Sequence, residues 1–81
     1  MKAIINIGLK KGVLDSAGKA THHRLDTVGF ADVVKDIRVG KQIIMELNCT
    51  DEATAKAEAT KMCEQLLANT VIEDYEIIIE A

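Results

Sequence analysis

The stretch from Gly12 to Thr21 has the residue types of a phosphate-binding loop, because Gly18-Lys19 falls between an expected strand and an expected helix. Such a loop needs four residues between its glycines and a Ser or Thr after its lysine. Five residues separate Gly12 from Gly18 here, and Ala20 stands where a hydroxyl would hold magnesium. A nucleotide site also needs a further carboxylate on a neighbouring strand of a larger domain. The sequence therefore predicts no nucleotide site in this stretch.

The histidines and cysteines are the next candidates for metal binding or acid–base work. His22 and His23 are adjacent in an expected helix, so they point in different directions and cannot form one metal-binding face. His22 has Asp26 four residues further on, a spacing typical of a surface contact. Cys63 lies on an apolar helix stripe and is expected in the core. Cys49 lies near a helix start, a place that favours a reactive thiolate, but the sequence places no histidine beside it.

Four acidic residues lie in the last expected strand: Glu73, Asp74, Glu76 and Glu80. Paired carboxylates can hydrolyse glycosides, but no aromatic or cleft-forming segment accompanies these. Charges on an edge strand more often prevent unwanted pairing with another sheet. We therefore expect no catalytic residue, no metal site and no cofactor site in this chain.

The composition sets limits on the partners. The 81 residues have the length of a single domain, residues 1–81, and a domain this short is marginal alone because folding buries only ~60% of its surface. A net charge of −3, with Phe30 and Tyr75 as the only aromatic residues, argues against nucleic acid. Residues 1–40 carry seven basic and four acidic residues, whereas residues 41–81 carry three basic and nine acidic ones. This split indicates either two solvated faces or a bipolar surface that orients assembly.

The sequence gives no sign of export or membrane insertion. The apolar run after Lys2 is short for a signal peptide, and no run approaches the ~20 residues of a membrane span. Cys49 and Cys63 do not make a disulfide framework. We therefore expect a cytoplasmic protein with no membrane role.

The hydrophobic pattern predicts six elements. Strands are expected over residues 2–9, 33–39, 41–47 and 71–80. Helices are expected between Asp15 and a left-handed Gly29, and from the capping groups of residues 48–51 to Asn69. Gly40 either turns a hairpin between the second and third strands or bends one long strand. The second helix carries an apolar stripe expected in the core: Ala55, Ala59, Met62, Cys63, Leu66 and Leu67. The order β-α-β-β-α-β predicts an α+β fold, a ferredoxin-like two-layer sandwich with two helices on one face of an antiparallel sheet.

The expected strands carry large aliphatic residues on both faces. When Ile5 faces the helices, Ile4 faces away, and Ile44 and Ile78 lie on the second face of their own strands. Exposing these three isoleucines would cost roughly 5–9 kcal/mol, comparable with the ~5–15 kcal/mol stability of a whole small domain. We expect another chain to cover this face, so that the protein is at least a dimer; the alternative is scattered surface isoleucines, which do occur.

Three segments together carry a resemblance to a known family. They are Leu9-Lys10-Lys11-Gly12-Val13-Leu14-Asp15 with Gly18-Lys19-Ala20, then Lys35-Asp36-Ile37-Arg38-Val39-Gly40-Lys41, and then residues 62–75, of which Leu66 to Tyr75 is the most specific part. In this order and at this length the chain resembles the PurS family, the small subunits of formylglycinamide ribonucleotide amidotransferase (phosphoribosylformylglycinamidine synthase). The resemblance covers nearly the whole chain.

The resemblance implies a required subunit of a glutamine-dependent carbon–nitrogen ligase in purine biosynthesis, with no catalytic residue of its own. In that family a PurQ glutaminase releases ammonia, and a PurL synthetase uses ATP and magnesium to activate the substrate amide. PurS subunits form dimers, or dimers of dimers. These bridge the glutaminase and the synthetase and support ammonia transfer. Keeping ammonia from water is physically sensible, because protonated ammonia is no nucleophile.

Some positions depart from the family pattern. Ser16 and Thr70 stand where proline is frequent, and Gln42 stands where an aromatic or apolar residue is expected. The chain also has one residue more than usual between Phe30 and Lys35, which could place a bulge in the second strand. These departures affect the expected local geometry more than the expected function.

The resemblance also points to residues that could contact partners. Arg38, Gly40 and Lys41 match an Arg-x-Gly-Lys signature, and Arg38 is well shaped to pair with a carboxylate of the synthetase or glutaminase. The alternative is that Gly40 serves a bend and the two bases are solvated. A second group at the entry to the last strand could join another subunit's sheet: Asn69, Val71, Glu73, Asp74 and Tyr75.

A rival function belongs to another class. A ferredoxin-like regulatory dimer that binds a small ligand would need a polar, glycine-lined pocket between subunits, which Gly8, Gly12 and Gly18 could supply. Tight binding of a small ligand by the isolated protein would favour this alternative.

Overall fold

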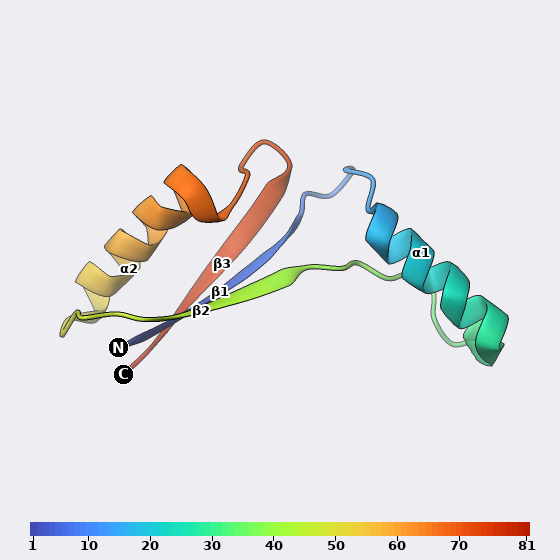
Figure 1. Cartoon of the computed structure of the whole chain (residues 1–81), viewed down its shortest axis with the longest axis horizontal. Coiled ribbons are helices and arrows are strands. Elements are labelled where there is room, and N and C mark those ends of the chain that lie inside the picture. The colour runs from blue at the N-terminus through green and yellow to red at the C-terminus, as the bar shows by residue number, and fades with distance from the viewer.

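The computed structural model describes all 81 residues, as three strands and two helices (Figure 1). The elements are β1 (Lys2–Leu9), α1 (Ser16–Leu25), β2 (Lys41–Glu46), α2 (Glu52–Met62) and β3 (Glu73–Glu80). Each helix ends in a wider π-helical turn of five residues, η1 (Asp26–Phe30) after α1 and η2 (Cys63–Leu67) after α2. Gly29 has a φ of 103°, so the left-handed residue predicted at the end of the first helix is confirmed.

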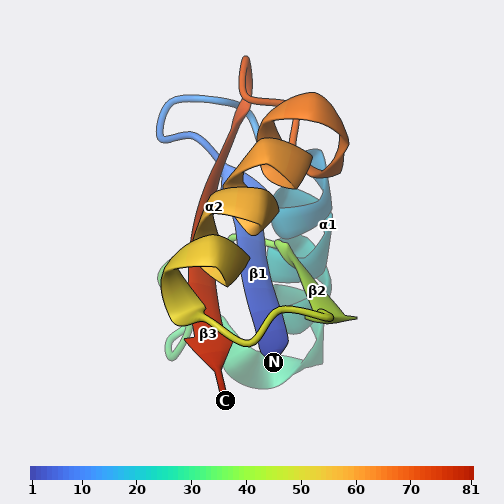
Figure 2. The same cartoon turned by 90° about the vertical axis from the view of Figure 1, so that its left-hand side faces the viewer.

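The sheet has β1 at its centre, with β2 and β3 antiparallel on either side. Ala3, Ile5 and Ile7 alternate on the buried face of β1, as the period of a strand requires. The second helix, α2, lies across this face (Figure 2). Its small residues Ala55 and Ala59 are fully buried, which allows the helix to approach the sheet closely.

The α+β class and the antiparallel sheet predicted from the sequence are confirmed, but the predicted order β-α-β-β-α-β is wrong in one element. Residues 33–39 form no strand. Both edges of β1 are occupied by β2 and β3, so this segment finds no neighbouring strand: Val33 lies in a turn, and residues 34–40 have no regular structure. The hairpin at Gly40 is therefore absent, and the extended chain runs through Gly40 into β2. The extra residue after Phe30 falls in a turn, in which the N–H groups of Val33 and Val34 both donate to the Phe30 carbonyl.

The prediction of two helices on one face of the sheet is also wrong, because only α2 covers it. Residues 10–40, here called the arm, extend away from the sheet and carry α1 with them (Figure 1). The arm folds on itself: residues 31–40, here called the returning chain, run back from the end of η1 toward the sheet. The His22 Nε2 lies 3.0 Å from the Val34 carbonyl oxygen, and this contact holds the returning chain against α1. The radius of gyration is 16.1 Å, whereas a compact chain of this length has ~12 Å. The chain alone is therefore elongated.

Smaller differences occur around the second helix. Leu66, predicted in the core, is 83% exposed, because the wider turn of η2 brings Cys63 and Leu67 inward and turns Leu66 outward. The helix ends at Ala68, which is extended, and Asn69 opens a turn. The last strand therefore begins at Glu73 and not at Val71. Neither helix has the length and hydrophobicity that crossing a bilayer would require.

Candidate functional site

The face of the sheet opposite α2, here called the open face, carries the three isoleucines singled out in the sequence. Ile4 pairs with Ile44 on one side and with Ile78 on the other, so the three side chains form one row across all three strands. Ile44 is 57% exposed and Ile78 is 42% exposed. The sequence prediction of a second apolar face is therefore confirmed in its geometry, and no element of the chain lies over it.

Polar residues border this row on both sides. Gln42 Nε2 donates to Asn6 Oδ1 at 2.9 Å, and Asn6 Nδ2 donates to Glu76 Oε1 at 3.1 Å. Gln42 thus serves a hydrogen-bonded row across the sheet in place of the apolar residue expected there. On the other side of the isoleucines, Lys2 lies in register between Glu46 and Glu80. The open face therefore has an apolar centre with polar, mainly acidic borders, a pattern typical of protein interfaces.

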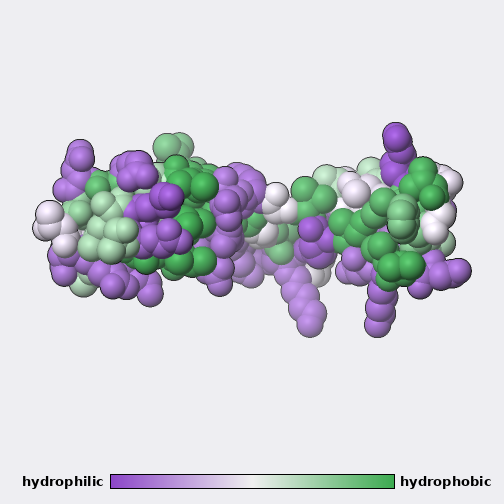
Figure 3. Space-filling model, turned by 90° about the horizontal axis from the view of Figure 1, so that it is seen from below, coloured by the Kyte–Doolittle hydropathy of each residue, from purple (hydrophilic) through white to green (hydrophobic).

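Hydrophobic residues reach the surface in both halves of the molecule. Figure 3 shows green atoms among purple ones over the sheet half and again over the arm, with a narrow connection between the two. In the arm, Leu14, Val28, Phe30 and Val33 are all exposed, with Val33 at 78%. Sequence reasoning missed this second surface because it assigned Val33 to a strand of the chain's own sheet.

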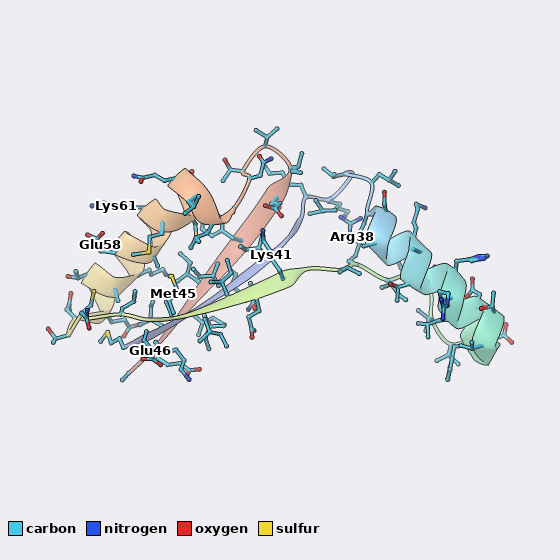
Figure 4. All side chains as sticks on the ribbon, in the orientation of Figure 1. Arg38, Lys41, Met45, Glu46, Glu58 and Lys61 are labelled. Carbon is cyan, nitrogen blue, oxygen red and sulfur yellow. The ribbon has the colours of Figure 1, made fainter.

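Arg38 is engaged with its own chain. Its Nη1 donates to the Val13 carbonyl oxygen at 3.3 Å, and its Nη2 donates to the carbonyl oxygens of Leu9 and Lys10 at 3.2 Å each. Figure 4 shows Arg38 at the base of the arm, between the returning chain and the start of α1. The sequence predicted that Arg38 contacts a partner. In the structure, both of its terminal nitrogens already have acceptors within the chain.

Lys41 and Glu73 bring the two predicted partner-binding groups together. Lys41 Nζ lies 3.9 Å from Glu73 Oε2, and the pair reaches across the end of β1 from β2 to β3. Gly40 lies beside them against β1: a Cβ on Gly40 would come within 2.7 Å of the Ile7 carbonyl oxygen. A glycine is therefore required at this position by close backbone approach and not by a hairpin.

The second group of residues predicted to bind a partner, at the entry to the last strand, has two kinds of position: some side chains hold a turn and others are exposed. Glu73 Oε1 accepts from the Asn69 N–H at 2.7 Å, and Asn69 Oδ1 accepts from the Val71 N–H at 3.2 Å, so the side chains of Asn69 and Glu73 hold the turn before β3. Val71 is 81% exposed at the tip of this turn, and Asp74 is exposed on the open face. Only these two side chains of the group are free to meet another subunit.

Tyr75 joins β3 to the second helix. Its hydroxyl donates to Glu64 Oε2 at 2.7 Å, and this hydrogen bond, with smaller contributions from burial and from nearby negative charge, raises the pKa of Tyr75 to about 12. The phenol therefore stays protonated at physiological pH, and the hydrogen bond fixes η2 against the sheet.

Asp15 has a second role that the sequence did not indicate. Its Oδ1 accepts from the Gly18 N–H at 2.7 Å, as the predicted cap of α1 requires, and its Oδ2 accepts from the Val39 N–H at 2.8 Å. These two backbone donors, followed by the charge of Arg38, lower the pKa of Asp15 against the opposing effect of burial. No local pattern reveals the bond to Val39, because the two residues are far apart in the chain.

The other candidates for chemistry lie apart from one another. His22 Nε2 is 3.7 Å from Asp26 Oδ1 on the surface of α1, as their spacing indicates. Cys63 is buried beneath α2, and its burial, with a smaller effect of Glu64, raises the pKa of the thiol. Cys49 lies in the loop before α2, and both cysteines are free. No two of these groups form a nucleophile and base pair.

The three glycines named for the rival function lie apart from one another in the single chain. A shallow hollow of about 360 Å³ beside the start of α1 is bordered by Gly12, Lys19 and Arg38. Gly8 lies on the open face, and Gly18 is buried against the Ile37 carbonyl oxygen. The three glycines therefore line no common pocket.

Comparison with known proteins decides the family. The PurS family model, described as phosphoribosylformylglycinamidine (FGAM) synthase, matches residues 2–81. The chain belongs to the PurS family. PurS from Synechocystis sp. is 48% identical over 71 residues, which cover 88% of this chain and 70% of the relative. PurS from Methanocaldococcus jannaschii is 42% identical over 79 residues, which cover 98% of this chain and 94% of the relative.

Solved PurS structures have the same fold. The chain superposes on M. jannaschii PurS with a TM-score of 0.89 and 42% identity, over 98% of this chain and 94% of that one. That protein is described as one of the subunits of formylglycinamide ribonucleotide amidotransferase in the purine biosynthetic pathway. Bacillus subtilis PurS gives a TM-score of 0.87 at 38% identity, covering 99% and 98% of the two chains. A chain of Thermotoga maritima PurLQS gives a TM-score of 0.86 at 32% identity, covering 95% and 93%.

These matches confirm the PurS family and the PurS-like fold predicted from the sequence. They also confirm the role predicted with them, that of the PurS subunit of FGAM synthase in purine biosynthesis, over the alternative of a regulatory dimer.

Proposed function

We propose that this chain is a non-catalytic bridging subunit that joins a PurQ-like glutaminase to a PurL-like, ATP-dependent synthetase and supports the transfer of ammonia between them. The T. maritima relative was solved as part of PurLQS, which supports this set of partners. ATP and magnesium are used by the synthetase in this proposal, and the PurS-like chain binds no cofactor itself. Its contribution is to hold two active sites in a fixed relation, which favours transfer of a reactive intermediate over its loss to water.

The observation that carries the proposal is the amount of surface that the chain leaves uncovered. The chain exposes 5856 Å², whereas a compact protein of 8.8 kDa exposes ~4,800 Å². The excess of roughly 1,000 Å² is comparable with the ~800 Å² that each partner buries in a standard interface. Much of this surface lies on the open face and the arm, both of which expose large apolar residues. A surface of this size and character favours a subunit that is completed by other chains.

A second copy of this chain is the first partner. The outer edge of β2 and the extended residues 34–40 both have backbone groups without a neighbouring strand. Two copies related by a two-fold axis near Gly40 could pair residues 34–39 of each with β2 of the other, which is the predicted hairpin made between chains. This pairing would also place each arm against the other copy's sheet. It removes an exposed edge, which otherwise favours aggregation.

The open face is then free for further contacts. Its row of Ile4, Ile44 and Ile78 is proposed to pack against another copy, giving a dimer of dimers, or against the synthetase or glutaminase. The exposed Val71 and Asp74 extend the same surface toward the turn before β3. A cytoplasmic location is proposed with this function, and the two free thiols of Cys49 and Cys63 are consistent with a reducing compartment.

Reconstitution tests the bridging role. Glutamine-dependent amidotransferase activity is measured with PurL-like and PurQ-like subunits, with and without this chain, and ammonia-dependent activity of the synthetase serves as the control. We expect glutamine-dependent activity to require the chain, whereas the chain alone has neither ATPase nor glutaminase activity. Glutamine-dependent activity that is unchanged when the chain is omitted would refute the bridging role.

A further inference from the structure

The direction of the arm depends on a small junction. The arm joins the sheet only where Leu9 continues into Lys10 and where Gly40 continues into Lys41. The hydrophobic core consists of residues from β1, β2, β3 and the second helix and its end, and none from the arm. Nothing in the core therefore holds the arm at its angle, and within one chain this is left to the contacts of the junction.

Asp15 joins the outgoing and returning chains of the arm next to these two connections. Its side chain is only 5% exposed, and its two oxygens accept from N–H groups on opposite sides, Gly18 in α1 and Val39 in the returning chain. A buried carboxylate that accepts two backbone hydrogen bonds is held in one geometry, because breaking either bond would leave a buried charge unsatisfied.

Arg38 closes the same junction from the outside. It comes from the returning chain and donates to three carbonyl oxygens on the outgoing chain, those of Leu9, Lys10 and Val13. These acceptors lie along the end of β1 and the turn that follows it. The separated terminal nitrogens of a guanidinium suit several acceptors at once, which the single ammonium of lysine does not. Arg38 is exposed, so these bonds act on geometry more than on overall stability.

Two glycines allow close backbone approach at the junction, Gly18 between α1 and the returning chain and Gly40 between the returning chain and β1. A Cβ on Gly18 would lie 2.4 Å from the Ile37 carbonyl oxygen and 2.9 Å from Asp15 Cγ, and a Cβ on Gly40 would lie 2.7 Å from the Ile7 carbonyl oxygen. Real side chains do not tolerate such distances to backbone atoms. By contrast, a Cβ on Gly8 or Gly12 would meet nothing within 4 Å. The absence of a side chain is therefore needed at the two glycines that border the junction.

We propose that Asp15 and Arg38 form a latch that fixes the angle between the arm and the sheet, and that Arg38 supports assembly as a positioning residue and not by contacting a partner. The arm keeps its place relative to the sheet in M. jannaschii PurS, as a TM-score of 0.89 over 98% of this elongated chain requires. Both N–H groups of Arg38 Nη2 are engaged, so a carboxylate from another subunit that bridged the two terminal nitrogens would have to displace the carbonyl of Leu9 or Lys10, which would weaken the latch. The latch is independent of the bridging role proposed above, whereas its effect on assembly rests on that role.

The variant Asp15→Asn separates the latch from the helix cap. Asparagine Oδ1 can still accept from the Gly18 N–H, but its Nδ2 is a donor and cannot accept from the Val39 N–H. Circular dichroism should therefore show α1 retained in this variant while the latch is lost. Lys35→Ala is the matched control, because Lys35 is an exposed base on the same returning chain.

The angle is measured on the full chain by the distance between spin labels on an arm residue and an α2 residue. His23→Cys and Lys56→Cys, both at exposed positions, carry the labels in a Cys49→Ser background, and Cys63 stays buried. The samples are diluted to a concentration at which the chain sediments as a monomer, so that no second copy holds the arm. We expect one narrow distance distribution for the parent and for Lys35→Ala, and a broadened one for Asp15→Asn and Arg38→Ala. An unchanged distribution in Asp15→Asn would overturn the latch, whatever the function of the protein.

Assembly with the PurL-like and PurQ-like subunits tests the second half of the proposal. If Arg38 positions the arm, Asp15→Asn and Arg38→Ala should each weaken binding by roughly 5–10-fold, and the double variant by no more than the stronger single one. Arg38→Lys should behave like Arg38→Ala. If binding is lost in Arg38→Ala but normal in Asp15→Asn, Arg38 contacts a partner directly and its assignment as a positioning residue is refuted.

Discussion

At the scale of single residues, the chain uses its polar groups to hold its own shape. Asp15, Arg38, Asn69 and Glu73 all bond to backbone groups of the same chain, although the last three were candidates for partner contact. A subunit proposed to bridge two enzymes needs accurate placement of its surfaces, and side-chain bonds to backbone provide it. The contacts of Asp15, and the hydrogen bond from Tyr75 to Glu64, can be followed by titration.

Asp15 should make stability depend on pH in acid. Its pKa is lowered in the folded chain from the ordinary value of 3.8, so its carboxylate stabilises the fold above that value and the effect is lost as the pH falls toward the lower folded pKa. We expect the Tm of the parent to exceed that of Asp15→Asn near neutral pH, and the difference to shrink below pH ~4. Thermal unfolding across this range checks it. A difference that stays constant in acid would contradict the charged role of Asp15.

Tyr75 offers a spectroscopic test, since it is the only tyrosine in a chain without tryptophan. Its pKa is raised from 10.0 to about 12, chiefly by the hydrogen bond to Glu64, so the bond stabilises the fold below pH 10 and is lost as the pH rises toward the folded value. We expect the phenolate absorbance of Glu64→Gln to appear at lower pH than that of the parent. Identical titration curves would show that Glu64 does not hold the phenol.

At the scale of elements, α2 is held to the sheet by small residues. Ala55, Ala59 and Cys63 lie one turn apart and are fully buried against β1 and β3. The close approach leaves no room for a larger side chain at these positions, and it explains why a helix with few large hydrophobic residues still packs well.

Substitution of Ala59 measures this packing. We expect Ala59→Leu to destabilise the chain by ~1–3 kcal/mol through overpacking, whereas Ala57→Leu, at an exposed position of the same helix, should change stability by less than ~0.5 kcal/mol. Urea unfolding of both variants gives the comparison. Equal effects would mean that α2 does not lie as close to the sheet as the structure indicates.

The elements also show how far the sequence alone could lead. The strands from Lys2, from Lys41 and over most of residues 71–80 are predictable, because their alternation is local and each has a partner strand in the chain. The caps at Asp15 and Gly29 and the row through Ile4 follow from the same local rules. Residues 33–39 have an equally clear strand pattern. A sequence pattern, however, cannot show whether such a segment pairs with another strand of the same chain or has no partner strand there. The hydrogen bond between Asp15 and Val39, and the direction in which the arm carries α1 away from the sheet, depend on contacts between residues far apart in the chain. No local signal encodes such contacts.

At the scale of the whole molecule, the chain is a long body of 49 × 26 × 14 Å with its apolar surface divided between two ends. The open face and the arm are separate surfaces, so one can serve self-association while the other meets enzyme subunits. A substitution on the open face should therefore affect the larger complex without dissolving the dimer proposed to form through the arms.

Ile44→Glu tests this division. Burying a glutamate in place of a large aliphatic residue should weaken binding of the PurL-like and PurQ-like subunits by at least roughly 10-fold, because ~1.5–3 kcal/mol of apolar burial is lost for each isoleucine. Sedimentation should give at least a dimer for the parent, and Ile44→Glu should still form a dimer. Leu66→Glu is the control, since Leu66 is exposed on the opposite side of the sheet with the second helix. A parent chain that sediments as a stable monomer at micromolar concentration would refute self-association itself.

The arm that leaves the sheet has a consequence for folding kinetics. The three strands, α2 and the contacts of the arm's junction can form within one chain, whereas the proposed pairing of residues 34–39 with β2 of a second copy can form only when two chains meet. Refolding should therefore show a first phase that is independent of protein concentration and a later one whose rate rises with it. The chain has no proline, so no slow proline isomerisation obscures the second phase. In the cell, newly made chains would be most exposed to proteolysis during the interval before they find a partner.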